Sequence, residues 1–589
     1  MRWICVVRPA QAVLKRRSMK RFFCLLALVT SVTSLGACAS DEASGPDDEW
    51  GMEGAVEPLP PPGKEDAQNR KGLLVATNTT RTQVWTAKNK WEDTETTSAR
   101  GAGIAWPENS GLTWDEKYAK WIDTMPWIVS TDGYSMTVNL TTPWGKTLPS
   151  PSLECAEMAL FLRITFAAWY ELPLQFEAFS SGQRVYFGHY GVRTAAGRFA
   201  SSPEFGVAYK DHSASTAWRT SWPKDSTLRS RQLWGGEDDQ IALGSGKRFG
   251  AYVDEIHLNK RAAYFTVLVL NYLSSVNLAD TANMYNVVPE AVHAGDVLVE
   301  RWQRDGIGHT LVVKEVRELG ASSLDVTTIS GSMPRRQGKH ESGVASKYYF
   351  TSEYTGGEGV ASDGTPYAKL GGGLKRFRVT KNVGGYWTNT WMTADEAHWI
   401  NSTDYARIAA RPARFQSILG QVSAAQQKTE LLAQIDDARR HLSNYPASCS
   451  ARERREGAFR SLYALAGELG TTEAALDADH RKLEDYVLGE LEYTKSKTCC
   501  WNSSTSGMYE LIMEKAEADQ AAADARGVCE APLVFASRRD GYAAWADYAA
   551  SVGRGSEWKA WSEDEGCPQR NVASDTIAPP DATPYCSLP

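Results

Sequence analysis

The chain has 589 residues, of which 42% are hydrophobic and 10% aromatic, so it is long enough to bury a sizeable core over two or three domains. It carries 64 Lys and Arg against 71 Asp and Glu, a formal net charge of −7. An acidic excess works against binding a phosphate backbone, so we expect no nucleic-acid partner. Beyond the N-terminal region, no apolar run approaches the roughly 20 residues that span a bilayer.

The first 37 residues have the pattern of an export signal. Residues 15–21 are mostly basic, residues 22–32 are apolar, and small residues follow up to Ala37. The Leu-Gly-Ala-Cys run at 35–38 resembles the bacterial lipobox, which implies that Cys38 carries lipid and anchors the protein to the outer membrane. The protein would then face the periplasm or the cell surface. An ordinary signal followed by a chance cysteine is the alternative interpretation.

The segment after the signal, residues 38–69, is acidic and rich in proline. It has nine Asp and Glu, one Lys and five Pro between residues 39 and 66. A segment of this composition buries little apolar surface, so we expect a disordered tether. Without the first 37 residues, which hold seven basic and no acidic residues, the balance is 57 basic against 71 acidic residues, a net charge of −14.

Residues 70–390 mix strand-like and helix-like patterns, which predicts an α+β domain. One helix should begin at Cys155 and run to about Trp169, and a second should cover roughly residues 254–274. Four runs of β-branched and aromatic residues predict strands: 135–140, 297–302, 310–316 and 324–329.

Residues 391–589 have apolar side chains at helical spacing, with Ala, Glu and Arg between them. This pattern predicts a C-terminal all-helical domain. Because export leads to an oxidising compartment, its cysteines should form disulfides, although the sequence does not choose among the possible pairings. The six cysteines are Cys449, Cys499, Cys500, Cys529, Cys567 and Cys586.

Cys155 is the one cysteine between Cys38 and this C-terminal set. It follows a Pro-rich loop and begins the first predicted helix. The positive end of the helix macrodipole and the unpaired N–H groups favour the thiolate of a cysteine at this place. The backbone N–H of Cys155 could also donate into an oxyanion hole. A burial role, with an inert thiol, is the alternative.

His309 has the most suggestive setting among the nine histidines. A Gly-Asp pair at 295–296 opens one predicted strand, and Gly308-His309 opens the next. A cysteine beginning a buried helix, then a Gly-Asp strand, then a Gly-His strand resembles the papain-like cysteine peptidases and amidases, especially the bacterial NlpC/P60 and CHAP cell-wall hydrolases. The resemblance covers the Cys155 helix and residues 294–332, less than half of the chain.

The resemblance implies a papain-like fold in which Cys155 is the nucleophile and His309 moves its proton. The family position of the third, His-orienting residue falls near Ser330, whereas Asp325 is the better chemical candidate because it is charged. The glutamine that papain-type enzymes keep before the cysteine is Pro149 here, so a second oxyanion donor has no candidate. About 150 residues separate Cys155 from His309, more than in the small bacterial domains.

The resemblance further implies hydrolysis of amide bonds, with peptidoglycan stem peptides as the substrate or, failing that, a protein. No His-x-x-x-His, Cys-x-x-Cys or calcium-loop pattern occurs, so we expect no metal and no cofactor.

Two other interpretations stay open. The Cys155 helix followed by Glu171-Leu172-Pro173 also looks like a transglutaminase core, in which His189 would take the place of His309 and Asp211 would be its acid. The third interpretation is an inactive papain-like fold, used as a cell-surface binding or scaffolding lipoprotein.

Overall fold

The computed structural model describes residues 70–77, 79–94, 110–180, 182–199, 202–234, 238–304, 308–320, 323–489, 491–493, 504–535, 539–559, 575–577 and 581–588. These residues all fall in one compact unit. The predicted signal, the tether and Cys38 lie outside the described residues, and so do Cys499, Cys500 and Cys567. Nothing is described of the Cys449 side chain.

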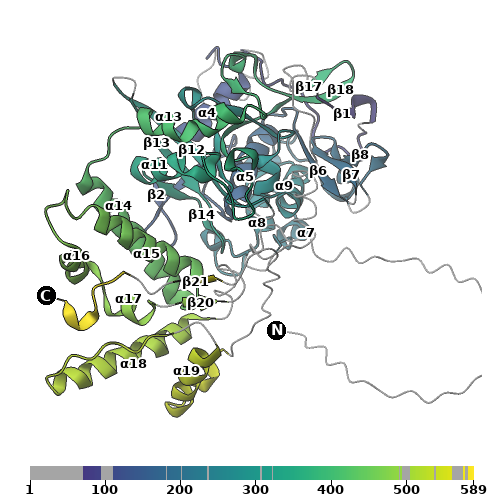
Figure 1. The fold of residues 1–589 in the computed structure, drawn as a ribbon. Helices are drawn as coiled ribbons and strands as arrows, with labels where there is room; N and C mark the ends of the chain where they lie inside the picture. The colour runs from purple at the N-terminus through teal and green to yellow at the C-terminus, as the bar shows by residue number, and fades with distance from the viewer. Residues whose placement is uncertain are drawn as a thin grey trace, which may run out of the picture. The chain divides into compact units, whose positions relative to one another are not determined.

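A seven-stranded antiparallel sheet organises the α/β part of the chain, residues 70–420 (Figure 1). Its strand order is β15–β13–β12–β11–β16–β10–β19, and every neighbouring pair is antiparallel. The last of these strands lies beyond residue 390, so the sheet extends into the start of the region predicted to be helical. The strands are β10 Met284–Val287, β11 Val297–Glu300, β12 His309–Gly320, β13 Ser323–Ser330, β15 Lys339–Glu341, β16 Gly373–Phe377 and β19 Trp399–Ile400.

Helix α5, Cys155–Trp169, packs on one face of this sheet (Figure 1). Every residue of α5 after Cys155 is buried, as expected for a helix that is apolar all round. On the sheet, Val297 and Val312 lie opposite each other and belong to the same apolar core as α5. The same core includes α4 Trp114–Thr124, α8 Phe249–Ile256 and α9 Lys260–Tyr272.

The other face of the sheet is covered by α11, Gly343–Thr351, and α13, Arg411–Ile418. Because side chains alternate along a strand, this face carries the residues between those that meet α5. Leu298 and Leu311 lie opposite each other there, in a core with Phe350 of α11. The two faces of the sheet therefore belong to two separate apolar cores.

Smaller sheets surround the main one. The short β5 pairs with β14 and joins the segment before Cys155 to residues 336–337. The remaining strands are β1 Arg70–Leu74, β17 Val379–Val383 and β18 Tyr386–Thr390 in one sheet, β2 Trp127–Val129, β3 Met136–Thr141 and β4 Thr147–Pro149 in a second, β6 Gln175–Ser180, β7 Gln183–Gly188, β8 Gly191–Thr194 and β9 Gly197–Arg198 in a third, and β5 Ser152–Leu153 with β14 Arg336–Gln337.

Short helices fill the connections of the α/β part. They are η1 Val75–Thr77, α6 Phe205–Ala208, η2 Ala217–Arg219, α7 Ser226–Arg229, η3 Ile241–Leu243, α10 Ser275–Ala279, η4 Pro289–Ala291, η5 Glu353–Thr355, η6 Tyr367–Lys369, η7 Thr393–Asp395 and α12 Tyr405–Ala409.

The remainder, residues 424–588, is mostly helical and is called the helical region below. Its longest helix, α14, starts with a capping box in which Ser423 and Gln426 satisfy each other's backbone N–H groups. The prediction of an all-helical domain is wrong in one detail, because β20, Leu491–Tyr493, pairs with β21, Asp575–Ile577. The helices are α14 Ala424–Asn444, α15 Cys449–Ala464, α16 Glu473–His480, α17 Leu483–Val487, α18 Ser506–Ala525, α19 Arg539–Ser551, η9 Gly555–Glu557 and η10 Tyr585–Ser587.

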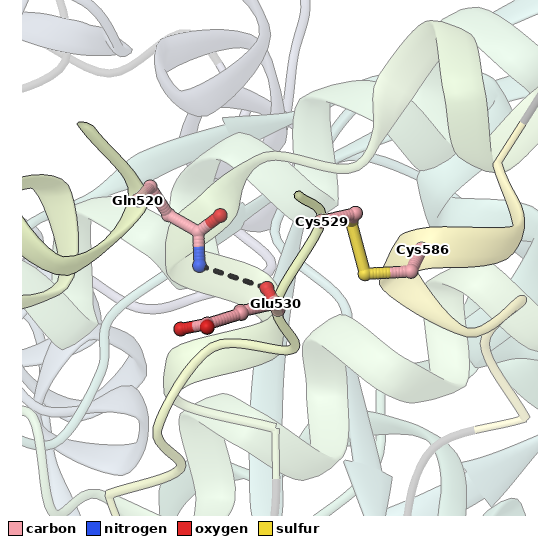
Figure 2. Close-up of a disulfide and its surroundings, with 4 residues drawn as sticks. All are labelled: Gln520, Cys529, Glu530 and Cys586. Atoms are coloured by element: carbon pink, nitrogen blue, oxygen red, sulfur yellow. Dashed lines mark hydrogen bonds between the residues drawn. A yellow bond between two sulfur atoms is a disulfide. The ribbon is translucent and has the colours of Figure 1, made fainter. Parts of the chain in front are cut away.

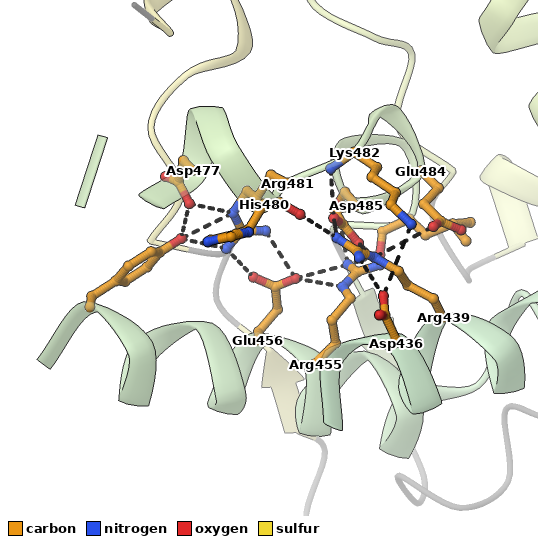
Figure 3. Close-up of polar contacts among 12 residues, drawn as sticks. Asp436, Arg439, Arg455, Glu456, Asp477, His480, Arg481, Lys482, Glu484 and Asp485 are labelled. Carbon is orange, nitrogen blue, oxygen red and sulfur yellow. Dashed lines mark hydrogen bonds and ion pairs between the residues drawn. The ribbon is translucent and has the colours of Figure 1, made fainter. Parts of the chain in front are cut away.

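Buried charges hold α14–α17 together, in what we call the α14–α17 charge network (Figure 3). Arg481 contacts Glu456 at 2.7 Å and Asp477 at 3.0 Å, while Arg455 and Arg439 both pair with Asp485. The network consists of Arg439, Arg455, Glu456, Asp477, Arg481 and Asp485, and each is less than 10% exposed.

The described part of the helical region contains one disulfide, formed by two of the six cysteines predicted to be oxidised. Cys529 is bonded to Cys586, which ties the end of α18 to η10 (Figure 2). Close to the bridge, the Gln520 side-chain amide donates to the carbonyl oxygen of Glu530 at 3.0 Å.

Candidate functional site

Cys155 is the first residue of α5, as the sequence predicts, and its thiol is partly exposed. The thiol lies 3.8 Å from the carbonyl oxygen of Gly308. A second glycine is needed nearby, since a Cβ at Gly331 would come within 2.4 Å of the Glu154 carbonyl oxygen. The glycine at 331 therefore lets the start of α5 approach the end of β13.

The segment before Cys155 is fixed by side chains from elsewhere in the chain. Gln240 is buried and accepts the Ser152 N–H at 2.9 Å while donating to the Ser152 carbonyl at 3.0 Å. This double hydrogen bond uses both ends of the amide, so Gln240 does not replace the oxyanion donor that Pro149 fails to supply.

Charged groups surround the first turn of α5. Glu157 accepts the backbone N–H of Glu154 at 2.8 Å, which satisfies one free donor of the helix start. Arg335 lies 3.2 Å from the Glu154 carboxylate and 2.7 Å from that of Glu157. Burial opposes the charged guanidinium, but the two carboxylates raise the pKa of Arg335 above its ordinary value. One guanidinium therefore bridges the two carboxylates at the start of α5.

His309 begins β12, directly opposite Glu300 at the end of β11. Its ring lies 5.7 Å from the ring of Tyr349 on α11. The residue as a whole is half-buried. Burial among the neighbouring side chains, together with the positive charges of Arg336 and Arg454, lowers the pKa of His309 to about 3. The ring is therefore neutral over the physiological range.

The two faces of the sheet separate the helix of Cys155 from the ring of His309. His309 shares its face with Leu311, which belongs to the core under α11, whereas α5 packs on the face of Val312. The structure thus brings the Cys155 thiol to the backbone that precedes His309, while the imidazole is directed to the α11 side.

The two candidates for the His-orienting residue have different places. Ser330 lies opposite Leu311, on the face of His309. Its hydroxyl donates to Glu341 at 2.5 Å and accepts from Arg336 at 3.0 Å.

Asp325 does not come near His309. It lies opposite Arg317, which is eight residues further along β12 than His309. At roughly 3.3 Å per residue, that separation is about 26 Å. Among the two candidates, only Ser330 is close to the histidine.

The residues of the transglutaminase interpretation make separate contacts. His189 is fully buried, with Nδ1 hydrogen-bonded to the backbone of Leu174 and its ring 4.3 Å from that of Trp387. Burial lowers the pKa of His189 to about 4. Asp211 accepts the N–H and hydroxyl of Ser213 instead. His189 and Asp211 therefore have different hydrogen-bond partners.

Sequence reasoning missed Glu300. This carboxyl group is 8% exposed, and burial raises its pKa to about 7, against the lowering effect of a hydrogen bond with Ser352. The order of the two predicted strands could have indicated this residue. When a short loop joins two antiparallel strands, the last residue of the first strand lies opposite the first residue of the second. Glu300 and His309 occupy those two positions.

The helical region contacts the α/β part close to this site. Lys339, which lies opposite Ser330, pairs with Asp437 of α14. Ser342, the N-cap of α11, donates to Glu430 at 2.7 Å. The charge of Arg454 on α15, as noted, reaches His309. Groups from α14 and α15 therefore belong to the surroundings of the candidate site.

Within the described residues, no group of three or more His, Cys, Asp or Glu side chains is arranged to hold a metal ion. In the same part of the chain, no helix has both the length and the apolar character to cross a membrane.

Comparison with known proteins gives no assignment. No family model matches the sequence, and neither the curated proteins nor the solved structures contain a significant match to the chain.

Proposed function

We propose that the protein is an exported cysteine hydrolase that cleaves amide bonds, on a papain-like fold. The observation that carries the proposal is the contact between the Cys155 thiol and the carbonyl oxygen of Gly308, the residue before His309. This contact joins the start of a buried helix to the start of a strand, which is the pairing on which the resemblance rests. The thiol is partly exposed, so a substrate carbonyl can reach it.

The reaction would pass through an acyl-enzyme. His309 takes the thiol proton, the sulfur bonds to the carbonyl carbon, and the backbone N–H of Cys155 donates to the oxyanion. The C–N bond then breaks as His309 returns the proton to the leaving amine. Water loses a proton to His309, attacks the thioester, releases the carboxylic acid and restores the thiol.

Proton transfer requires the ring of His309 to turn from Tyr349 towards the thiol. Catalytic hydrogen bonds are often long in a free enzyme and tighten when substrate binds. The contact at Gly308 keeps the His309 backbone within reach for this movement.

The substrate we propose is the stem peptide of peptidoglycan. The cell-wall hydrolases that the sequence resembles act there, and residues 1–38 predict export with a lipid anchor at Cys38. A protein substrate is the alternative within the same chemistry. Export, lipidation and the outer-membrane location stay predictions, because these residues lie outside the described part of the chain.

A specific observation favours a second candidate, an inactive binding or scaffolding lipoprotein. The thiol donates to a carbonyl oxygen, and the imidazole is held neutral on the other face of the sheet. If the ring never turns, it does not accept the thiol proton.

Incubation of the purified protein with muropeptides, with products identified by mass spectrometry, tests the two candidates. We expect stem-peptide cleavage that is lost in both Cys155→Ala and His309→Ala. The His189→Ala variant is the control for the transglutaminase interpretation and should remain active if it folds. Cleavage that persists in Cys155→Ala, or binding of muropeptides without cleavage, would contradict the hydrolase.

A further inference from the structure

The side chains of Glu300 and His309 share one face at one end of the sheet. In the antiparallel pair of β11 and β12, these two residues lie directly opposite each other. Opposite residues place their Cβ atoms roughly 4.5–5.5 Å apart on the same face. A carboxyl group and an imidazole of such a pair can therefore meet without any change in the backbone.

The backbone around the pair is held from three sides. The Gly308 N–H donates to the hydroxyl of Ser275 at 2.8 Å, and the Arg301 N–H donates to the carbonyl of Tyr354 at 2.8 Å. A Cβ at Gly308 would lie 1.8 Å from the Glu300 carbonyl oxygen, so only glycine allows this approach of the two strands. The relative position of Glu300 and His309 is consequently fixed.

Four groups from other elements face the pair. The negative charges of Glu341 on β15 and of Glu300 add to the effect of burial in raising the pKa of Tyr349 on α11, and the Tyr349 ring lies 5.7 Å from that of His309. Arg336 of β14 and Arg454 of α15 supply positive charge to the same place. Burial disfavours the ionised carboxylate of Glu300, and a hydrogen bond with Ser352 favours it.

We propose that Glu300 is the positioning residue of His309, an inference that rests on the proposed hydrolase. With the ring in the position described, its carboxyl group would turn from Ser352, accept the hydrogen of one ring nitrogen and fix the tautomer, so that the other nitrogen is unprotonated when the ring turns towards the thiol. The two candidates from the sequence fit this role less well. Asp325 is too distant, and the Ser330 hydroxyl is engaged with Glu341 and Arg336.

The first test uses the unmodified protein. Histidine labelled with ¹⁵N in the ring gives separate signals, and those of His309 are identified by their loss in His309→Asn. If Glu300 faces the ring, the His309 signals should change as the carboxyl group titrates, near pH 7. Signals that stay constant between pH 5 and 9 would overturn the inference, whatever the activity of the protein.

The second test compares Glu300→Gln and Glu300→Asp with Glu315→Gln. Glu315 lies on the same strand as His309, paired with Arg317 at the surface, and serves as the matched control. The glutamine variant should lose the pH-dependent change of the His309 signals and shift the pH–rate profile, while the aspartate variant should restore part of both. The control should match the wild type.

The outcomes separate the two proposals. If Cys155→Ala cleaves as fast as the wild type, the hydrolase itself is wrong. If Cys155→Ala and His309→Ala are inactive but Glu300→Gln keeps the wild-type pH profile and His309 signals, the hydrolase stands and the role of Glu300 is wrong.

Discussion

The α/β part and the helical region are stabilised in different ways. The α/β part has a large apolar core in which Phe166 of α5 contacts the aromatic rings of Trp114, Tyr118 and Trp121. The helical region has smaller apolar clusters, and its helices also share the α14–α17 charge network (Figure 3). Apolar contacts are non-directional, whereas buried ion pairs depend on every partner being present and ionised. The two regions should therefore respond differently to mutation and to pH.

The largest effect should come from removing Arg481. The change Arg481→Ala removes the guanidinium that pairs with buried Asp477 and leaves Glu456 with Arg455. Breaking a buried pair in this way costs about 3–5 kcal/mol. Hydrogen exchange followed by mass spectrometry should show the loss in α15–α17 and not in α5. Arg554→Ala is the matched control, because its ion pairs lie at the surface, and it should leave the exchange unchanged.

The second prediction concerns acid and the α/β part. His189 is buried and neutral, with a pKa lowered to about 4. In the unfolded chain it takes up a proton near pH 6.5, so its contribution to stability is complete above that pH and is lost as the pH falls to about 4. The shift corresponds to about 3 kcal/mol. Urea unfolding at pH 7 and pH 4.5, detected by exchange in β7, should show this loss.

His189→Phe is the control for the acid effect. It should lower the stability at pH 7, because the hydrogen bond to Leu174 disappears, but it should reduce the difference between the two pH values. An unchanged difference would assign the effect to another group, of which buried His257, with a pKa lowered to about 3, is the first candidate.

The third prediction concerns the disulfide. Replacing Cys529 and Cys586 with serine opens a loop whose ends are 57 residues apart, which should destabilise the helical region by about 2–4 kcal/mol. Exchange should increase in α18 while α5 remains protected. A variant as stable as the wild type would mean that hydrogen bonds of the tail alone hold this end of the chain.

The smallest expected effect is the acid response of the charge network. Burial opposes the ionised form of Asp485, but Arg455, Arg439 and the Lys482 N–H hold its pKa below the ordinary value. The stabilisation from Asp485 is therefore present above about pH 4 and is lost only below it. Titration of Asp485 should therefore cause no loss of amide protection in α17 between pH 7 and 4.5. Because burial lowers the pKa of His441 on α14 to about 3, the measurement is made in His441→Phe, and loss of protection above pH 4.5 in that variant would contradict the prediction.

The regular elements of the α/β part could be predicted from local patterns. The helix expected from Cys155 to about Trp169 is α5, and the run 324–329 is β13. The helix expected over 254–274 is instead two helices, α8 and α9, because Asn259 caps the start of the second with a hydrogen bond to Arg261. A cap inside a long apolar pattern is easily read as part of one helix.

The candidate site could be predicted only in part. The helix start at Cys155 follows from the sequence. The resemblance implied that the thiol meets His309, whereas the structure brings it to the carbonyl oxygen of the preceding Gly308. The direction of the His309 side chain could not be foreseen. One face of β12 carries Thr310 and Val312, the other carries Leu311 and Val313, and all four residues are buried. Alternation alone therefore does not tell which face α5 covers. The place of Glu300 required the register of β11 against β12.

The contact of Asp477 with the tail has a consequence for the order of folding. Its carboxylate accepts the backbone N–H of Thr583 at 2.8 Å, from a residue 106 positions further along the chain. During synthesis from the N-terminus, α14–α17 are complete long before this donor exists. Until Thr583 arrives, a buried carboxylate lacks one of its hydrogen bonds, which costs free energy. The helical region should therefore reach its final packing only after the downstream chain has been made, whereas α5 and its sheet can fold earlier.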